Sequence, residues 1–216
     1  MSTRRFSTFL FDLDGTLIDS IELIMASYQH TLRTHRGHVP PDEIWLAGLG
    51  TPLRMQFRRF TDDDAEIEAM VATYQAHNLA HHDALVRDYP GVPEMVRALS
   101  ARGTRLGVVT SKRRPGTMLG LAKGGFDGLF EVLVTADDVE RPKPHPEPVE
   151  RALEQLGAAA ADTVFVGDSP HDLAAGKGAG VATAAVLWGP FPRATLEQHD
   201  PDFWIADPSD LTALAA

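Results

Sequence analysis

The stretch Phe9-Leu10-Phe11-Asp12-Leu13-Asp14-Gly15-Thr16-Leu17 decides the fold of this 216-residue chain. Its apolar beginning belongs to a run, Thr8–Phe11, that predicts a buried strand. Asp12 and Asp14 follow directly, and in open parallel sheets ligands gather at the carboxyl ends of strands. Gly15 allows the backbone to turn at once and to approach a ligand closely. The stretch therefore predicts a strand that delivers two carboxylates to a binding site.

Similar apolar runs, each ending abruptly in a polar residue or glycine, recur along the chain. They predict four further buried strands: Arg105–Val109, Val132–Thr135, Thr163–Val166 and Val181–Leu187. Segments with helical spacing lie between the strands, and several begin with proline and end at glycine. These predicted helices are Pro93–Arg102, Pro115–Lys123, Pro146–Leu156 and Pro170–Gly176. The alternation predicts an α/β fold with a doubly wound, mainly parallel sheet and helices on both faces.

The region from Asp19 to Asp88 breaks this alternation, because it carries helix signals and no convincing strand. At its start, Asp19 and Glu22 have the spacing of a capping box. Apolar residues then recur at helical spacing and predict a packed helix face: Ile21, Ile24, Met25, Tyr28 and Leu32. We therefore expect an all-helical cap domain inserted after the first strand. The predicted division assigns residues 1–18 and 89–216 to the core domain and residues 19–88 to the cap.

Composition excludes several kinds of chemistry and partner. The chain has no cysteine, which removes disulfides, thiolate metal sites and thiol nucleophiles. Its 20 Lys and Arg residues stand against 30 Asp and Glu residues, and the net charge of −10 repels nucleic acids and anionic membranes. No stretch approaches the roughly 20 apolar residues of a membrane span. We expect a cytoplasmic protein without nucleic-acid or membrane partners, and the sequence does not report its oligomeric state.

A second acidic pair, Asp168 and Asp172, follows the predicted strand Thr163–Val166. If this strand and the first one end together, four carboxylates share one pocket. Like charges about 4 Å apart repel by about 4 kcal/mol at an effective dielectric constant near 20. A divalent cation would offset that repulsion, and a set of oxygen ligands alone favours Mg²⁺ over zinc or copper.

Two further segments suit an anionic ligand. Thr110 and Ser111 place a pair of hydroxyl groups at the end of the predicted strand Arg105–Val109. Lys143 lies between two prolines, which stiffen its backbone, just before a predicted helix. Either segment alone is typical of an ordinary surface or strand end. Beside the aspartates, the two segments predict a phosphate-binding site.

In this order, the motifs resemble those of the haloacid dehalogenase superfamily of phosphohydrolases. Phe9–Leu17 is similar to the family's first motif, Thr110 to its second, Lys143 to its third, and Gly167–Asp172 to its fourth. The helical insertion is similar to the first type of cap in this family. The resemblance reaches both ends of the chain, and it implies a Rossmann-like core with an inserted helical cap.

The resemblance also implies a role for each site residue. Asp12 would attack phosphorus and form an aspartyl-phosphate, and Asp14 would act as general acid and base. The phosphate-binding residues would be Thr110, Ser111 and Lys143. Mg²⁺ would be held by Asp12, Asp168 and the main-chain carbonyl of Asp14, while Asp172 would orient the waters of the metal.

Several stretches outside the motifs look closest to the family's bacterial inorganic pyrophosphatase branch. They are His81–Val86, Thr135–Glu140, Thr183–Val186 with Trp188, and Pro201–Phe203. We therefore expect inorganic pyrophosphate as the substrate, in a small, polar and basic pocket. The phosphoglycolate phosphatases share the architecture, so phosphoglycolate or another small phosphomonoester is the alternative.

A non-enzymatic alternative is a receiver-like signalling domain, which also combines an acidic Mg²⁺ pocket, a phosphorylated aspartate, a hydroxyl residue and a lysine. The long helical insertion disfavours this alternative, and so does Asp14, which would hasten hydrolysis where a switch requires it to be slow. His77, His81 and His82 lie together in the predicted cap. Because no carboxylate is spaced to complete a metal site with them, we interpret them as a solvated helix face.

Overall fold

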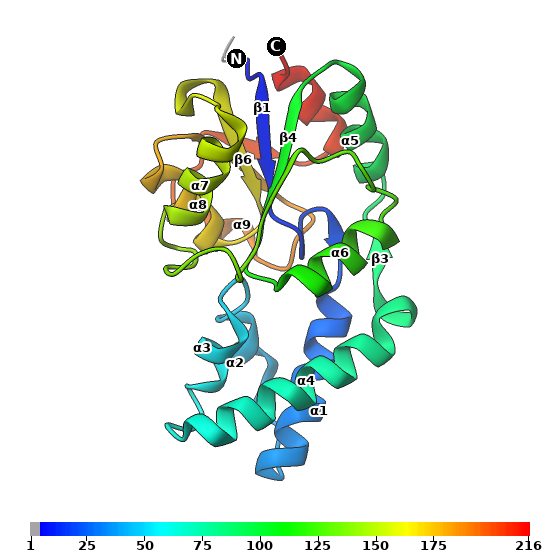
Figure 1. Ribbon diagram of the computed structural model, residues 1–216, viewed down its shortest axis with the longest axis vertical. Helices are drawn as coiled ribbons and strands as arrows, with labels where there is room; N and C mark the ends of the chain where they lie inside the picture. Colours follow the sequence, from blue (N-terminus) through cyan, green and yellow to red (C-terminus); the bar gives the residue numbers. More distant parts are fainter. Residues whose placement is uncertain (1–4) are drawn as a thin grey trace.

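The computed structural model describes residues 5–216 and shows a central sheet with helices on both faces (Figure 1). Six strands lie in the order β5-β4-β1-β6-β7-β8, and every neighbouring pair is parallel. Their bounds are β1 (Thr8–Phe11), β4 (Arg105–Val109), β5 (Val132–Val134), β6 (Thr163–Gly167), β7 (Ala182–Val186) and β8 (Phe203–Ile205). The predicted α/β class with a doubly wound parallel sheet is confirmed.

Side chains of β1 alternate between the two faces of the sheet and divide the core into two apolar clusters. Phe9 and Phe11 belong to one cluster, and Leu10 belongs to the other. The first cluster includes residues of α5 (Val92–Ala101), α6 (Arg114–Lys123) and the C-terminal 3₁₀ helix (Pro208–Leu214). The second includes residues of α7 (Glu147–Leu156) and α8 (Pro170–Gly178). Burial on both faces explains why these strands are almost continuously apolar.

The sequence did not predict the edge of the sheet. β8 pairs with β7 there, and the short helix α9 (Arg193–Glu197) precedes it. The two elements are three and five residues long, too short to show a period of two or of 3.6 residues.

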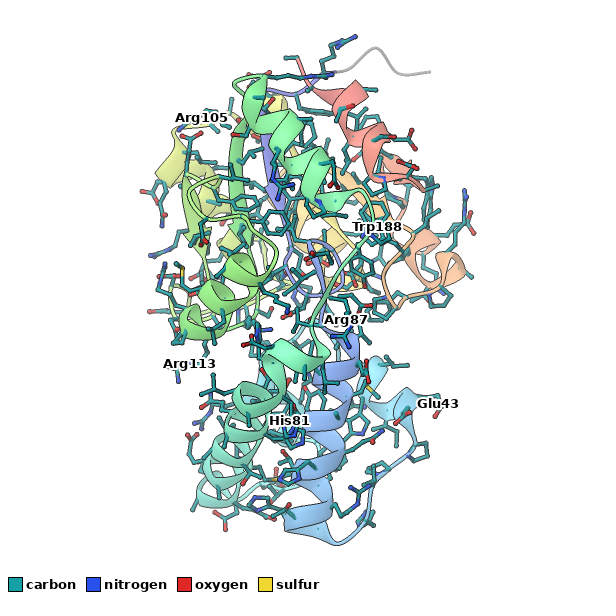
Figure 2. All side chains as sticks on the ribbon, turned by 90° about the vertical axis from the view of Figure 1, so that its right-hand side faces the viewer. Glu43, His81, Arg87, Arg105, Arg113 and Trp188 are labelled. Carbon is teal, nitrogen blue, oxygen red and sulfur yellow. The ribbon has the colours of Figure 1, made fainter. Side chains whose placement is uncertain are left out.

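Four helices form the insertion between β2 (Ile18–Asp19) and β3 (Arg87–Asp88), two short strands that pair antiparallel. The helices are α1 (Ile21–Arg36), α2 (Asp42–Leu46), α3 (Leu53–Phe57) and α4 (Asp64–Leu85). Figure 2 shows Arg87 where these helices join the core. Both limits of the proposed cap, residues 19–88, fall in this two-stranded connection. Residues 1–4 of the proposed core lie outside the described residues.

The cap has its own apolar core, built where α1 packs against α4 and the shorter helices. Ile24, Tyr28 and Leu32 of the predicted α1 stripe are buried. The ring of Tyr28 stacks on that of Trp45 at 4.2 Å between centroids. Every helix within residues 5–216 is too short or too polar to cross a membrane.

The predicted capping box at Asp19 and Glu22 is wrong. Helix α1 begins at Ile21, and Ser20 precedes it without capping it through its side chain. Instead, the Ser20 hydroxyl donates a 2.5 Å hydrogen bond to Asp14 Oδ1. A carboxylate is a stronger acceptor than a neutral group, so the active-site turn holds this hydroxyl and ties the first cap helix to it.

Candidate active site

The register of the central strands brings the predicted site residues to one edge of the sheet. Phe11 of β1 lies opposite Val108 of β4 and Val166 of β6. Asp12 follows Phe11 immediately, and Thr110 and Asp168 each follow two residues after their paired valines. Because all three strands are parallel, these side chains emerge together at the carboxyl edge.

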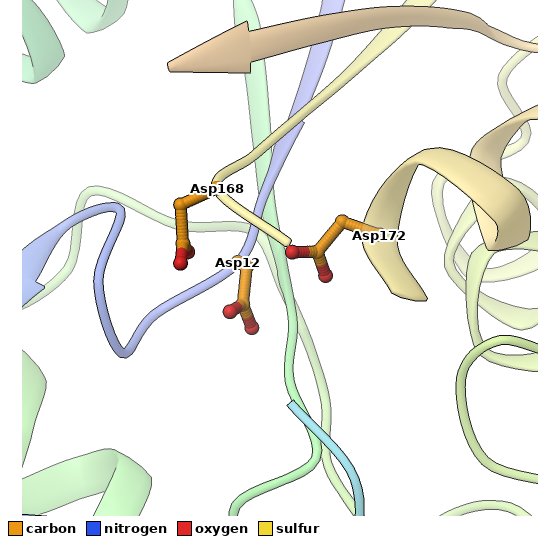
Figure 3. Close-up of side chains that lie close together, drawn as sticks. All are labelled: Asp12, Asp168 and Asp172. Carbon is orange, nitrogen blue, oxygen red and sulfur yellow. The ribbon is translucent and has the colours of Figure 1, made fainter. Parts of the chain in front are cut away.

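Three carboxylates meet at this edge, as Figure 3 shows. Asp12, Asp168 and Asp172 each offer an oxygen, and these oxygens lie within 4.8 Å of one another. All three side chains are buried. The sequence prediction that the two acidic strand ends converge is therefore confirmed for these residues.

Lys143 is the cation inside this cluster, and its side chain is only 1% exposed. Its Nζ donates to Asp12 Oδ1 at 2.8 Å, to Asp172 Oδ1 at 2.6 Å and to the Val109 carbonyl at 3.1 Å. Its three hydrogens are thus fully used by the protein. Lys143 is not among the residues that line the adjacent cavity, although the sequence predicts that it contacts phosphate.

Burial dominates the electrostatics of the cluster. Loss of water raises the pKa of Asp12 to about 7, although Lys143 lowers it, and the charge of Asp172 raises it further. Burial likewise raises the pKa of Asp168, assisted by Asp172 and Asp12. For Lys143, burial alone would lower the pKa, but Asp12 and Asp172 together raise it. One lysine does not offset three buried carboxylates.

The residues present fit a divalent metal ion. The cluster supplies only oxygen donors, carries more negative than positive charge and is shielded from water. Asp168 Oδ1 accepts a 2.7 Å hydrogen bond from Thr16, while Oδ2 has no partner among the described residues. Hard oxygen donors and uncompensated negative charge are what Mg²⁺ and similar ions require.

Two glycines make room for the Asp168 carboxylate. A Cβ atom at Gly15, whose φ is +89°, would lie 2.6 Å from Asp168 Oδ2. A Cβ atom at Gly189 would lie 2.4 Å from the Cβ of Asp168. Both positions therefore exclude a side chain, and Gly15 also requires the left-handed backbone that glycine adopts freely.

Asp172 has both oxygens engaged by the protein. Oδ1 accepts from Lys143, and Oδ2 accepts from the Ser169 amide at 3.0 Å and the Ser169 hydroxyl at 2.6 Å. Ser169 and Asp172 form a capping box at the start of α8. The carboxylate is therefore held rigidly, which suits the predicted role of orienting other groups better than direct ligation of a metal.

Asp14 lies beside the carboxylate cluster but its side chain does not join it. Its Oδ1 accepts from Ser20 Oγ at 2.5 Å and from Lys112 Nζ at 2.7 Å. Its Oδ2 has no partner among the described residues, and Asp14 lines the cavity. The predicted metal contact of Asp14 thus rests on its main-chain carbonyl alone. Sequence reasoning missed Lys112, since a lone lysine after a strand is usually a solvated surface group.

The hydroxyl pair at the end of β4 divides between two environments. Thr110 Oγ1 accepts a 3.2 Å hydrogen bond from the Lys112 amide. The Ser111 hydroxyl is buried and has no partner among the described residues. Both residues line the cavity. An unpartnered buried hydroxyl is rare in folded proteins, so Ser111 is available to donate to a bound anion.

A cavity of about 760 Å³ lies between the core and the cap. Its core wall includes Asp12, Asp14, Thr110, Ser111, Lys112 and Asp168. Its cap wall includes Ile24, Tyr28, Leu49, Leu53, Arg54, Gln56, Val71 and Tyr74. The expectation of a small, polar and basic pocket is therefore wrong in its size and polarity, although Lys112, Arg113 and Arg54 line the cavity. The cap helices turn part of their apolar core toward the cleft, which the sequence pattern alone does not reveal.

The raised pKa of Asp12 predicts how stability depends on pH without metal. Between its ordinary value of 3.8 and about 7, the folded state binds the extra proton, so stability present near pH 4 is lost as the pH rises toward 7. The asparagine side chain of the Asp12→Asn variant has no ionisable group. The stability of this variant relative to the unaltered protein should therefore increase by roughly 1.4 kcal/mol for each pH unit across this window. Urea unfolding in EDTA would measure this, and a difference that stays constant with pH would contradict it.

A parallel α/β core, an acidic centre at its carboxyl edge and an inserted helical cap define a hydrolase with a Rossmann-like core and a cap domain. The chain belongs to the haloacid dehalogenase-like hydrolase family, whose sequence profile matches residues 9–186. This match confirms the resemblance seen in the motifs.

Relatives of known name cover almost the whole chain. "Pyrophosphatase PpaX" of Bacillus cereus strain G9842 is 44% identical over 207 residues, covering 96% of this chain and 95% of the relative. The protein of the same name in Anoxybacillus flavithermus is also 44% identical, covering 96% of each chain.

Solved structures agree with the fold. A predicted phosphoglycolate phosphatase from Haemophilus somnus has a TM-score of 0.86 at 26% identity, covering 97% of this chain and 98% of that one. A haloacid dehalogenase-like family hydrolase from Streptococcus pneumoniae has a TM-score of 0.83 at 22% identity, covering 99% of both. The second likeness concerns the fold alone.

Proposed function

We infer that this hydrolase cleaves inorganic pyrophosphate with Mg²⁺, through an aspartyl-phosphate on Asp12. The observation that supports the chemistry is the buried cluster of Asp12, Asp168 and Asp172 around Lys143, with Asp14 at the adjoining cavity. The name of relatives that are 44% identical along nearly their whole length supports the substrate.

Asp12 is the proposed nucleophile. Lys143 fixes its Oδ1, and Oδ2 accepts no hydrogen bond from the described residues. The free oxygen forms a bond to phosphorus while the bond from phosphorus to the leaving phosphate breaks. Water then attacks the same phosphorus and releases the second phosphate, which restores the carboxylate.

Asp14 is the proposed general acid and base of both steps. Ser20 and Lys112 hold its Oδ1, Oδ2 has no partner among the described residues, and Asp14 lines the cavity. In the first step this carboxyl group gives a proton to the departing phosphate, and in the second it takes a proton from the attacking water. Lys112 and Ser20 therefore position the acid and base of the reaction.

The metal-binding residues would be Asp12, Asp168 and the main-chain carbonyl of Asp14, with Asp172 supporting them through Lys143. When bound, Mg²⁺ supplies positive charge that offsets the negative charge of the transferring phosphoryl group. Thr110 and Ser111 supply hydroxyl groups on the same wall.

Cationic side chains around the cavity suit the second phosphate of a diphosphate. Arg54 of the cap and Arg113 of the core line it together with Lys112. Charge-assisted hydrogen bonds to phosphate oxygens are strong, and one arginine guanidinium can donate two of them in parallel to the same phosphate. The net charge of −10 also disfavours a nucleic-acid or membrane partner.

The second candidate is phosphoglycolate or another small phosphomonoester. The specific observation in its favour is the apolar part of the cap wall, including Ile24, Leu49 and Val71, which a diphosphate does not require. A receiver-like switch is disfavoured because the cap encloses a cavity beside Asp12 and because Asp14 is available for proton transfer.

Steady-state kinetics at millimolar Mg²⁺ decide between the substrates. We expect kcat/KM for pyrophosphate to exceed that for phosphoglycolate, hexose phosphates and nucleotides by at least about tenfold, since a tenfold preference requires only about 1.4 kcal/mol. Asp12→Asn protein purified in parallel controls for contaminating phosphatases. The reverse ranking would transfer the assignment to the phosphomonoester.

A further inference from the structure

Three histidines of the cap form a column of stacked rings that the catalytic site does not use. His30 of α1 stacks on His77 of α4 with 4.4 Å between ring centroids and 24° between planes. His77 stacks in turn on His81, one helical turn along α4, at 4.1 Å and 19°. Figure 2 shows His81 in the cap. None of the three lines the cavity described above.

The hydrogen bonds of His77 fix where its ring carries hydrogen. Ser27 Oγ donates its only hydrogen to the Leu23 carbonyl at 2.7 Å. The same oxygen lies 3.1 Å from His77 Nδ1, so it accepts there and Nδ1 is the donor. The lone pair of His77 is therefore on Nε2.

The ring of His81 also carries its hydrogen on Nδ1, for a similar reason. Its Nδ1 lies 2.9 Å from the His77 carbonyl, which can only accept. In its neutral form, His81 therefore also has its lone pair on Nε2. Neither Nε2 atom has a hydrogen-bond partner among the described residues.

Neutral rings with one nitrogen donating inward and the other free are the usual state of histidine metal ligands. Burial, followed by the neighbouring His81 and His30, lowers the pKa of His77 and keeps that ring neutral near pH 7. Histidines four residues apart on a helix lie on one face and can bind the same metal ion.

We propose that this column is a second metal site, which binds a divalent transition-metal ion such as Zn²⁺ through Nε2 of His77 and His81. His30 supplies a third nitrogen from α1. The rings lie face to face, so binding requires the exposed rings of His30 and His81 to turn, a fast rotamer change. His81 then gives up its contact with the His77 carbonyl, whereas His77 keeps its bond to Ser27 and needs no rotation. Imidazole ligands select zinc, copper or nickel over Mg²⁺, which separates this site from the carboxylate cluster.

Metal binding here would link α1 to α4 and stabilise the cap. The experiment uses the full chain with excess Mg²⁺, so that the carboxylate site is occupied, and titrates Zn²⁺ by calorimetry. We expect one Zn²⁺ per chain. His77→Gln and His81→Gln should each weaken its binding by at least about tenfold, because loss of a residue that merely supports a metal ligand already costs about 10- to 100-fold.

His38→Gln is the matched control. His38 is an exposed cap histidine whose Nδ1 also lies near a backbone carbonyl, that of Arg36 at 3.0 Å, but it belongs to no stack. This variant should bind Zn²⁺ as the unaltered protein does. Equal Zn²⁺ affinity in the His38→Gln, His77→Gln and His81→Gln proteins would overturn the proposal.

Spectroscopy with Cu²⁺ tests the ligands directly and does not depend on activity. We expect nitrogen hyperfine structure in the electron spin resonance spectrum of the first Cu²⁺ bound in excess Mg²⁺, and its loss in the His77→Gln/His81→Gln protein. A spectrum with oxygen ligands alone would contradict the proposal. Circular dichroism of each variant confirms that the cap helices are retained, and Asp12→Asn protein should keep this site even if it loses turnover.

Discussion

Asp12→Asn reduces turnover of pyrophosphate by about 10⁴-fold or more in our expectation, in the range found when a covalent nucleophile is removed. An amide oxygen does not attack phosphorus as a carboxylate does. The substitution keeps the shape of the side chain, and its oxygen can still accept from Lys143, which now donates to Asp12 Oδ1 at 2.8 Å. The variant should therefore fold and retain substrate binding, so the effect should appear in kcat.

Rapid acid quenching of a single turnover measures the intermediate itself. Mass spectrometry should find one phosphoryl group on the peptide that contains Asp12 in the unaltered protein and none in Asp12→Asn. Asp14→Asn is the matched control: it removes a neighbouring carboxylate at the same cavity but leaves the nucleophile. It should lose about 10²- to 10⁴-fold in rate, as general acid–base catalysis predicts. Substantial turnover by Asp12→Asn would exclude Asp12 as the nucleophile.

The fold was largely predictable because parallel strands buried on both faces leave a clear sequence signal. The strand Thr8–Phe11 is buried on both faces and is followed by the charged residue Asp12. The sequence therefore indicates both that this segment is a strand and where the strand ends. β8 gave no such signal because it is short and lies at the edge of the sheet. The helical nature of the cap followed from its spacing, whereas the orientation of its helices depends on packing such as that of Tyr28 against Trp45.

The meeting of Asp12 and Asp168 was predictable for a topological reason, since the carboxyl ends of adjacent parallel strands share an edge. The partners of these groups were not. Lys112 donates to Asp14 although the two residues are 98 positions apart in the sequence. The Ser20 hydroxyl also donates to Asp14, and it does not cap the helix that follows it. Such contacts depend on side-chain direction within the folded site, which residue spacing does not specify.

Lys143 shows the same limit most clearly and leads to the largest expected effect on stability. The phosphate contact of Lys143 stays a prediction, whereas the position of its ammonium group between Asp12 and Asp172 could not be predicted from the sequence. Lys143→Met would keep most of the buried volume and leave both carboxylates without their cation. Breaking a buried pair in this way costs about 3–5 kcal/mol. Urea unfolding at pH 7 without Mg²⁺ should show this loss, and turnover should fall because Asp12 loses its orientation.

A double substitution separates charge imbalance from simple loss of packing. Lys143→Met/Asp172→Asn removes one of the stranded carboxylates, so it should be more stable than Lys143→Met alone by about 0.5–3 kcal/mol, the range of coupling between groups in contact. Lys177→Met is the matched control, because Lys177 pairs at 3.2 Å with Asp200, whose side chain is 97% exposed. Exposed pairs contribute about 0–1 kcal/mol, so this control should change little. If Lys143→Met were no less stable than Lys177→Met, or if the double variant recovered nothing, the charge of Lys143 would not be what stabilises Asp12 and Asp172 side by side. Recovery of stability without recovery of turnover, by contrast, would assign to Lys143 the orientation of Asp12 as well as the neutralisation of its charge.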